Sequence, residues 1–376
     1  MLRAAGLAVL LTGAAACSGT EETTGPVLEV SSFGAVGDGR ADDTAALQRG
    51  LAALKPGETL RLGAGRVFRH SVVLKVTTPG VRLVGPGTLL AVHEESSALQ
   101  VQAAHVTVRD LRLAVVGTTR RWSTPDQHKL VLGAYEGITV RDVTILGSAA
   151  TGLFCLGTYS FTLQGVQVFD TRADGIHMTG GAKDGRVLSP RITRSGDDGV
   201  AVVSYLDDHQ PCRNITVLSP RVRTTTGGRG ISVVGGQHIT YRDIDIDASS
   251  AAAVYVACEG GDSVTFPSEH VRVAGGRITH ANSNGSIDHG AVLVYAGRRE
   301  GDVTDVRISD LEISGTRAGA SRQIGTVSDQ QDPVSDIRFT GLRLAASPTP
   351  YQGNAPSSAV VLEDVTAAGA SVTAAR

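Results

Sequence analysis

Three aspartates and one arginine recur at matching positions of neighbouring sequence segments. Asp174 stands in ADG, the pair Asp197 and Asp198 in SGDDG, and Arg229 in GRG. Carboxyl groups brought close together cannot all ionise easily, so at least one keeps a raised pKa and stays protonated near neutrality. Glycoside hydrolysis needs that inequality, because one carboxylic acid protonates the leaving oxygen while a carboxylate activates water. These residues therefore predict acid–base chemistry on a glycosidic bond, provided that the fold stacks their segments.

The segments that hold these residues belong to an internal repeat. A small residue recurs at spacings of 23, 24, 31 and 23 residues, at Gly152, Gly175, Gly199, Gly230 and Ala253. Short alternating runs of Val, Ile, Leu and Thr precede each one, as in strands separated by turns. A period near 23 residues is typical of a parallel β-solenoid, whose coils stack at about 4.8 Å. Stacking would place Asp174 about one coil rise from Asp198, with Arg229 on the next coil.

The alternation within the repeat predicts which side chains face the core. Two columns are uniformly apolar and should point inward: Leu153, Ile176, Val200, Ile231 and Val254, and Cys155, Met178, Val202, Val233 and Val256. The column between them should point outward: Phe154, His177, Ala201, Ser232 and Tyr255. A propeller or a sandwich is the competing all-β interpretation, but neither needs stacking with this period.

The segment FGAVGDGRADDTAALQRGLAAL, residues 33–54, is the one clear helical pattern. Asp42 or Asp43 should cap an amphipathic helix that runs to Leu54, before the stop signal Pro56-Gly57. An open solenoid end exposes unpaired strand edges and apolar core, so we expect this helix to cover it.

The sequence FGAVGDGRADDTAALQ closely resembles the motif with which chains of the pectin-degrading superfamily enter their β-helix. Within that superfamily, ADG, SGDDG and GRG resemble the family 28 glycoside hydrolases, the polygalacturonase family. Its signature is Asn-Thr-Asp, Asp-Asp, Gly-His-Gly and Arg-Ile-Lys on successive coils. The resemblance implies a single-stranded right-handed parallel β-helix over residues 28–376. It also implies that Asp197 is the catalytic acid, while Asp174 and Asp198 position and deprotonate the water, giving inversion.

The match to that signature is partial. Arg229 replaces the His of Gly-His-Gly, and Tyr255-Val256-Ala257 stands where Arg-Ile-Lys is expected. Both cations that grip a sugar carboxylate are therefore missing, which favours a diverged member with another substrate or another chemistry.

Four residues near the aspartates are candidates for substrate binding: His177, Arg229, Tyr255 and Trp122. His177 should face solvent one strand position beyond Asp174, where it could bind substrate, relay a proton or be inert. Arg229 either contacts substrate, stands in for the missing His or forms a structural ion pair. Tyr255 could stack on a sugar or only on neighbouring rings. Trp122 lies in the loop of residues 117–129, which we expect to wall the groove.

The first residues predict export. Within residues 1–16, a basic residue and an apolar stretch are followed by small residues before Cys17. Small residues directly before a Cys resemble a bacterial lipoprotein signal, with Cys17 as the lipidated first mature residue. Ala14 departs from that pattern, so plain secretion stays open. Residues 17–27 read as a flexible tether, and the protein should be either lipid-anchored at the cell envelope or secreted. At most one pair could form among the other three cysteines.

Composition narrows the function further. The 376 residues carry a formal charge of −2, only 19% are charged and 4% aromatic, while 46 are glycine. This excludes a basic nucleic-acid binder, a polytopic membrane protein, a coiled coil and a disordered chain. We expect a monomer that acts on a polysaccharide, needs no cofactor or metal, and meets a membrane only through its lipid anchor. The alternatives are a lyase or epimerase acting on a uronate-containing glycan, and a non-catalytic glycan-binding surface protein.

Lipidation gives the first testable prediction. Cys17→Ser should move the protein from the membrane fraction of a bacterial host to the soluble fraction, because the thiol that carries the acyl chains is gone. Fractionation followed by mass spectrometry of the mature N-terminus checks this. A wild-type mature chain that starts elsewhere and carries no lipid would eliminate the anchor.

Overall fold

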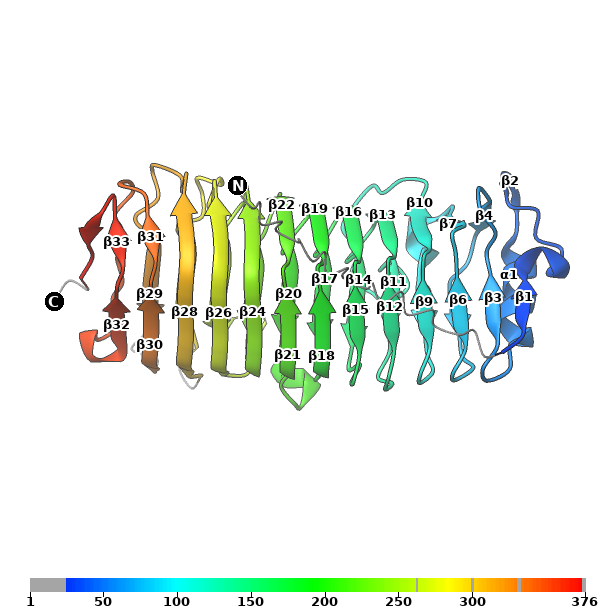
Figure 1. Ribbon diagram of the computed structural model, residues 1–376, viewed down its shortest axis with the longest axis horizontal. Coiled ribbons are helices and arrows are strands. Elements are labelled where there is room, and N and C mark those ends of the chain that lie inside the picture. The colour runs from blue at the N-terminus through cyan, green and yellow to red at the C-terminus, as the bar shows by residue number, and fades with distance from the viewer. Residues whose placement is uncertain (1–24, 262, 299–300, 330–332, 374–376) are drawn as a thin grey trace, which may run out of the picture.

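The described chain coils along one axis, from β1 (Val27–Glu29) at one end of the molecule to β33 (Thr366–Ala367) near the other (Figure 1). The structure is a computed structural model and describes residues 25–261, 263–298, 301–329 and 333–373. The predicted signal and Cys17 lie outside the described residues. The strands that are described form sheets of 24 and 10 strands, and among them only β33 and β34 pair antiparallel. The all-β fold, a single-stranded parallel β-helix, is confirmed.

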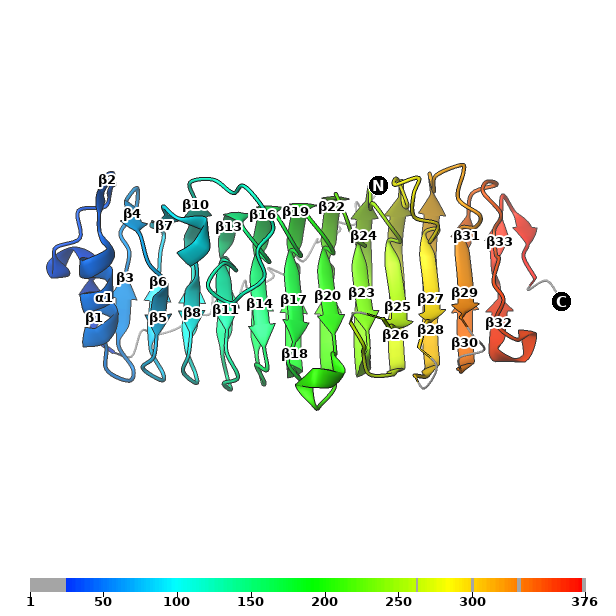
Figure 2. The same ribbon diagram turned by 180° about the vertical axis from the view of Figure 1, so that it is seen from behind.

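The ten-stranded sheet runs along the side seen in Figure 2. Its members, in chain order, are β5 (Leu74–Val76), β8 (Leu99–Val101), β11 (Leu130–Leu132), β14 (Leu153–Leu156), β17 (Ile176–Thr179), β20 (Val200–Val203), β23 (Ile231–Val234), β25 (Val254–Cys258), β27 (Val292–Ala296) and β29 (Ile324–Ser328).

The larger sheet is made of two rows that meet at a bend. The first row holds β1 (Val27–Glu29), β3 (Thr59–Arg61), β6 (Arg82–Val84), β9 (Thr107–Arg109), β12 (Thr139–Arg141), β15 (Thr162–Gln164), β18 (Lys183–Leu188), β21 (Arg213–Leu218), β30 (Val334–Thr340) and β32 (Val360–Glu363). The second row holds β2 (Asp38–Asp42), β4 (Val67–His70), β7 (Thr88–Ala91), β10 (Arg112–Val115), β13 (Thr144–Ser148), β16 (Gln167–Thr171), β19 (Arg191–Ser195), β22 (Arg221–Thr225), β31 (Arg343–Leu344), β33 (Thr366–Ala367) and β34 (Ala370–Ser371). Three long strands run through both rows: β24 (Gly236–Asp247), β26 (Ser268–Thr279) and β28 (Val303–Ser314).

In every described coil but the one that joins β6 to β7, one residue makes the bend between the two rows. It has left-handed backbone geometry, with φ of 59° at Asp110, 52° at Asp142, 62° at Gly165 and 54° at Asp243. Gly, Asp and Asn reach this conformation at the lowest cost among the residue types. The regular Gly, Asp and Ser punctuation of the sequence therefore marks a real corner of each coil.

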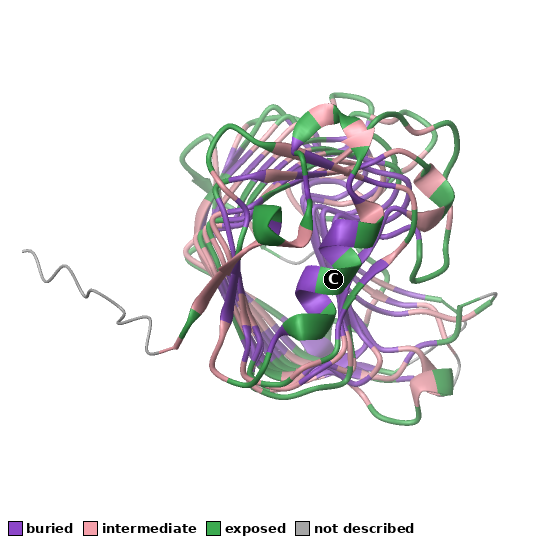
Figure 3. Cartoon of the chain, turned by 90° about the vertical axis from the view of Figure 1, so that its right-hand side faces the viewer, coloured by how far each residue is buried: buried purple, intermediate pink, exposed green. Residues whose placement is uncertain are grey.

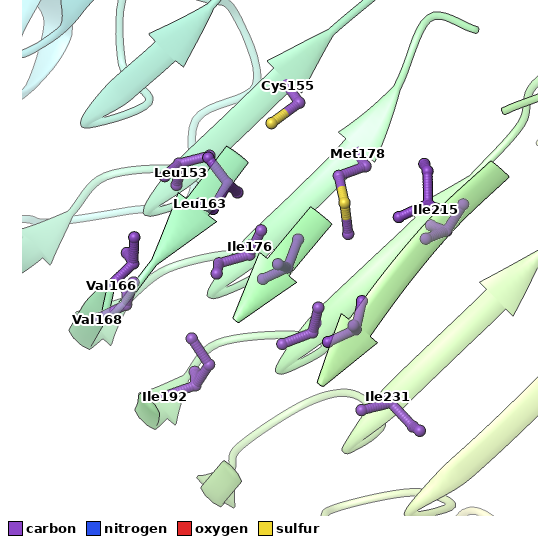
Figure 4. Close-up of a cluster of buried hydrophobic side chains, with 14 of the residues drawn as sticks. Leu153, Cys155, Leu163, Val166, Val168, Ile176, Met178, Ile192, Ile215 and Ile231 are labelled. Carbon is purple, nitrogen blue, oxygen red and sulfur yellow. The ribbon is translucent and has the colours of Figure 1, made fainter. Parts of the chain in front are cut away.

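Both predicted inward columns are confirmed. Leu153 pairs in register with Ile176, Ile176 with Val200, and the column continues to Ile231 and Val254. These side chains are buried against residues of the opposite rows, such as Leu163 and Ile192 (Figure 4). Viewed along the axis, the buried residues line the inside of the coil (Figure 3). Cys155, Cys212 and Cys258 are buried free thiols, so the pair that the sequence left open is not formed.

The repeated small residue is explained by the closeness of neighbouring coils. A Cβ on Gly152 would lie 2.4 Å from Val168 Cγ1 and 2.7 Å from the carbonyl oxygen of Gly175. A Cβ on Gly175 would meet Ile192 Cγ2 at 2.4 Å in the same way. Glycine is thus required here by lack of space, whereas its backbone angles are ordinary.

Helix α1 (Thr44–Ala53) covers the N-terminal end of the coil, as expected, and buries Leu47 and Leu51 there (Figure 3). Asp43 stands at the N-cap position without a side-chain capping bond, and the neighbouring Asp42 accepts the Thr44 N–H at 2.9 Å with its Oδ1. Asp43 instead accepts the N–H of Val36 at 2.6 Å. The remaining helical turns are the 3-10 segments η1 (Val30–Phe33), η2 (Glu94–Ser96), η3 (Leu206–Asp208) and η4 (Ser357–Ala359). In the described part of the chain, no helix has the length and apolar character of a membrane span.

The crowding at the glycine column predicts a stability effect. Gly152→Ala should lower the free energy of unfolding by about 1–3 kcal/mol, because the added methyl overlaps atoms of the neighbouring coil. Gly117→Ala is the matched control, since its Cβ would meet nothing within 4 Å. Urea denaturation of both variants decides the matter, and equal stabilities would contradict the packing explanation.

Candidate active site

The three aspartates lie together at the turns that lead from the second row into the ten-stranded sheet. Asp174 stands between β16 and β17, and the pair Asp197 and Asp198 stands one coil on, between β19 and β20. One oxygen of each carboxylate lies within 4.8 Å of one oxygen of each of the others. Arg229 follows on the next coil, between β22 and β23. The grouping expected from coil stacking is therefore present.

Asp174 is held in its charged form. Only 7% of its surface is exposed. His177 Nδ1 lies 2.7 Å from its Oδ2, and the N–H of Asp198 donates to its Oδ1 at 2.9 Å. Burial opposes ionisation, but the imidazole and these hydrogen bonds outweigh it and keep the pKa of Asp174 below its ordinary value.

His177 was expected to face solvent, and this is wrong. Its column points outward in the predicted register, yet only 7% of the residue is exposed. The Phe154 ring on the preceding coil covers one side, with ring centres 5.4 Å apart, and the imidazole also joins Asp174. An outward position on a sheet becomes a buried one where loops and long side chains cover that sheet.

Asp198 has the opposite environment to Asp174. It is 4% exposed, and its oxygens accept the N–H of Arg229 at 2.6 Å and the hydroxyl of Ser232 at 2.5 Å. Burial raises its pKa to about 7; the positive charge of Arg229 opposes the rise, and the neighbouring charges of Asp197 and Asp174 add to it. Asp198 is therefore the carboxyl group that holds a proton near neutrality. The predicted inequality within the cluster is present.

Asp197 pairs with a cation that the sequence analysis did not identify. Arg121 donates from Nη1 to Asp197 Oδ2 at 2.7 Å, and the Asp197 side chain is 26% exposed. Hydrogen bonds hold the loop that carries Arg121 in place. The Arg172 guanidinium donates to the Thr118 hydroxyl at 2.9 Å, and the backbone N–H of Trp122 donates to the Ala149 carbonyl at 2.9 Å. The only sign of this contact in the sequence was the basic pair Arg120 and Arg121 before Trp122. The repeat period does not predict where a loop folds, so the contact of Arg121 with Asp197 could not be predicted.

A pocket of about 230 Å³ opens over Asp174 and His177. Its walls include Trp122, Phe154 and Tyr205, so the loop of residues 117–129 does form one wall, as expected. Arg120 stacks on the Trp122 ring at 3.7 Å and fixes its plane. Aromatic faces beside carboxylates suit a sugar ring, whose C–H groups pack on the rings while its hydroxyls bond to the acids.

Tyr255 and Arg229, which were candidates for substrate binding, contact each other and neighbouring protein side chains. Arg229 covers one face of the Tyr255 ring at 4.3 Å, and His289 stacks on that ring at 5.2 Å. Glu259 binds both, at 2.9 Å from Arg229 and 2.8 Å from the Tyr255 hydroxyl. Tyr255 is only 2% exposed, so its ring is not free to stack on a sugar. It stacks on neighbouring protein groups, which is the second of the two roles considered from the sequence.

The carboxylate oxygens of Asp174, Asp197 and Asp198 accept hydrogen bonds from protein donors. Three carboxylates at this separation are a donor set that a divalent cation takes. Here, however, both oxygens of Asp174 and both of Asp198 already accept hydrogen bonds, and Arg121 compensates the charge of Asp197. The arrangement fits proton transfer better than metal binding.

Comparison with solved structures supports the fold. No protein-family model matches the chain, and no curated protein matches it in sequence. The catalytic unit of a GH87 α-1,3-glucanase from Streptomyces thermodiastaticus is similar at a TM-score of 0.65 and 20% identity, over 90% of this chain and 68% of that one. The A-module of mannuronan C-5 epimerase AlgE6 from Azotobacter vinelandii is similar at a TM-score of 0.60 and 15% identity, over 90% and 98%. This likeness supports a right-handed parallel β-helix fold, and it does not support the family 28 assignment that the sequence motifs implied.

Several of the glucanase structures carry one aspartate-to-alanine substitution each and hold nigerose or tetrasaccharides. The substituted positions are separated by 23 residues and by one residue. Asp174, Asp197 and Asp198 have the same separations. The present chain spans about two thirds of the length of these catalytic domains.

The environment of Asp198 gives a prediction for stability against pH. Its folded pKa of about 7 exceeds the ordinary 3.8, so between these values the folded state keeps a proton that the unfolded chain has released. The contribution of this group to the free energy of unfolding is therefore nearly complete at pH 4 and is lost as pH rises to about 7. An Asn side chain has the shape of Asp but does not ionise, so Asp198→Asn should not lose stability in this pH range. The variant should therefore gain melting temperature over wild type at pH 8 but not at pH 4.

Asp170→Asn is the matched control. Asp170 lies on the preceding coil in an exposed ion pair with Arg194, at 2.6 Å, so this variant should not gain stability at either pH. A melting-temperature difference for Asp198→Asn that is the same at pH 4 and pH 8 would show that its carboxyl group is not the protonated one.

Proposed function

We propose that the protein is a polysaccharide-degrading glycoside hydrolase, with Asp174, Asp197 and Asp198 as its catalytic residues. One observation carries the proposal: coil stacking packs three carboxyl groups beside a pocket with aromatic walls, and their environments push the pKa of Asp174 down and that of Asp198 up. The shared spacing with the aspartates substituted in the GH87 glucanases supports it. A turn residue would need neither burial nor unequal protonation.

In this proposal Asp174 activates the water. It lines the pocket and is charged, and His177 holds it in place. Asp174 takes a proton from a water whose oxygen then bonds to the anomeric carbon. The Cys17 anchor and export are proposed with it, since the predicted signal suits an enzyme that meets a polymer outside the cell.

The proton for the leaving oxygen comes from the adjacent pair Asp197 and Asp198. The family resemblance implies Asp197 as the acid, and it is the more exposed of the two. The proton of the free protein rests on Asp198, because burial of that carboxyl group outweighs the attraction of the Arg229 guanidinium, which lies 3.8 Å from its Oδ1. Asp197 and Asp198 are adjacent in the chain and lie in one cluster, so we propose that the pair delivers one proton to the glycosidic oxygen through Asp197.

The stereochemical course is proposed as inverting, from the resemblance. Most inverting enzymes keep their carboxyl groups about 6.5–9.5 Å apart and retaining ones about 5–5.5 Å. The nearest oxygens here lie within 4.8 Å, which by itself resembles the shorter class. Proton NMR of the first-formed anomer distinguishes the two courses.

A neutral glucan suits the pocket better than a polyuronate. Ala257 and the covered Tyr255 offer no cation to a sugar carboxylate, and the Arg121 guanidinium is already paired with Asp197. The lyase or epimerase alternative rests on His177, a buried imidazole joined to Asp174 that lines the pocket and suits proton abstraction, and on the likeness to the epimerase fold.

The test is product analysis on a panel of α-1,3-glucan, other neutral glucans, polygalacturonate and alginate. We expect new reducing ends from a neutral glucan and poor turnover of polygalacturonate. Asp174→Asn and Asp197→Asn should each lower turnover by roughly 10²–10⁴-fold with the fold intact, since each removes one proton-transfer group. Their combined loss should be less than the product of the two, because the groups act together.

Asp207→Asn is the control, an exposed aspartate of η3 near the pocket wall, and it should keep full activity. Absorbance from an unsaturated uronate, or altered uronate configuration without chain cleavage, would replace hydrolysis by the lyase or epimerase reaction. If wild type acts on no glycan and the aspartate variants unfold, the aspartates are structural and the glycan-binding alternative holds.

A further inference from the structure

A second hollow, separate from the catalytic pocket, lies on the outer face of β16, β19 and β22. It encloses about 290 Å³, and its lining includes Gln167, Phe169, Arg191, Thr193, Arg221 and Arg223. These strands are the ones whose far ends lead into the catalytic turns, so both sites lie on the same coils. We call this hollow the arginine groove.

Two like charges are stacked in the arginine groove. Arg191 and Arg221 are in-register partners on β19 and β22, and like charges directly opposite destabilise a sheet. Further along the same column the charges alternate in sign, since Arg221 faces Asp245 and Asp245 faces Arg277. Arg191 is the member that breaks this alternation, at a cost in stability that the fold does not require.

Both of these guanidinium groups are unused by the protein. Arg191 and Arg221 are exposed, and within the described residues neither side chain has a hydrogen-bond or ion-pair partner. Arg223 shows the contrast, because it donates to the backbone carbonyl of Asp245 at 2.9 Å and pairs with the Asp245 carboxylate. The groove thus presents two free planar donors one coil rise apart, about 4.8 Å.

We propose that the arginine groove binds an acidic unit of a polysaccharide, a sugar that carries a sulfate or a carboxylate. Guanidinium groups match such anions with paired, charge-assisted hydrogen bonds. Phe169 is half-buried in the adjacent column and gives the sugar ring an apolar face. The groove would hold the protein on an acidic polymer without taking part in bond cleavage.

A nucleic acid fits the groove less well. Duplex binding needs a run of cations along many phosphates. Here the column returns to Asp245 one coil after Arg221, and the whole chain carries a charge of −2.

The experiment measures binding of dextran sulfate, with uncharged dextran of the same length as the control polymer, by calorimetry at low salt. We expect wild type to bind dextran sulfate and polygalacturonate but not dextran at this site, with affinity falling as salt rises. The double variant Arg191→Gln, Arg221→Gln should bind at least tenfold more weakly. It should also melt no lower than wild type, because the charge repulsion is gone.

Arg112→Gln is the matched control variant. Arg112 is exposed in the same column but faces Thr88 and Thr144 and lies outside the groove, so its loss should leave affinity within twofold. An equal loss from Arg112→Gln, or duplex DNA bound as tightly as dextran sulfate, would overturn the proposal. If the double variant misfolds, the two single variants are measured instead. Binding does not depend on turnover, so a failure of the proposed hydrolase activity would be seen separately.

Discussion

The hydrogen-bond ladder between successive coils is the constraint on which the rest of the structure depends. Each strand pairs in parallel and in register with the strand one coil away, so a residue type at one position becomes a column along the whole molecule. Apolar columns close the interior. Glycine stands where two coils come too close for a Cβ, and a residue with left-handed backbone geometry turns nearly every described coil at the same corner.

The same ladder concentrates charge at the candidate active site. Asp174 and Asp198 cannot move apart without breaking the strands that carry them, so their repulsion is relieved by different partners. Asp174 is bound by a buried imidazole, and Asp198 accepts hydrogen bonds from a backbone N–H and a hydroxyl. Asp197 pairs with a guanidinium from a loop that is distant in sequence. Because each partner shifts proton affinity differently, equal chemical groups acquire unequal roles.

The fold alone does not choose the chemistry. A glucanase and an epimerase share this β-helix at similar structural likeness, and the scaffold hosts either reaction by changing the residues on a few turns and loops. In this chain the turns supply three acids and the loop of residues 117–129 supplies Arg121 and the pocket wall. The sheet face beside them carries a column in which two arginines, Arg191 and Arg221, are direct in-register neighbours.

The repeat period alone predicts the coils, the inward columns and the meeting of Asp174 with Asp197 and Asp198, because a fixed period converts linear spacing directly into position. The pattern of residues 33–54 also predicts the capping helix, although the structure was needed to show that Asp43 stands at the N-cap position while Asp42 accepts the Thr44 N–H. The folded structure was needed to show that Arg121 reaches Asp197, that His177 and Tyr255 are covered, and that Asp198 carries the proton. These features depend on where loops and long side chains pack over the sheet, and that packing has no period in the sequence.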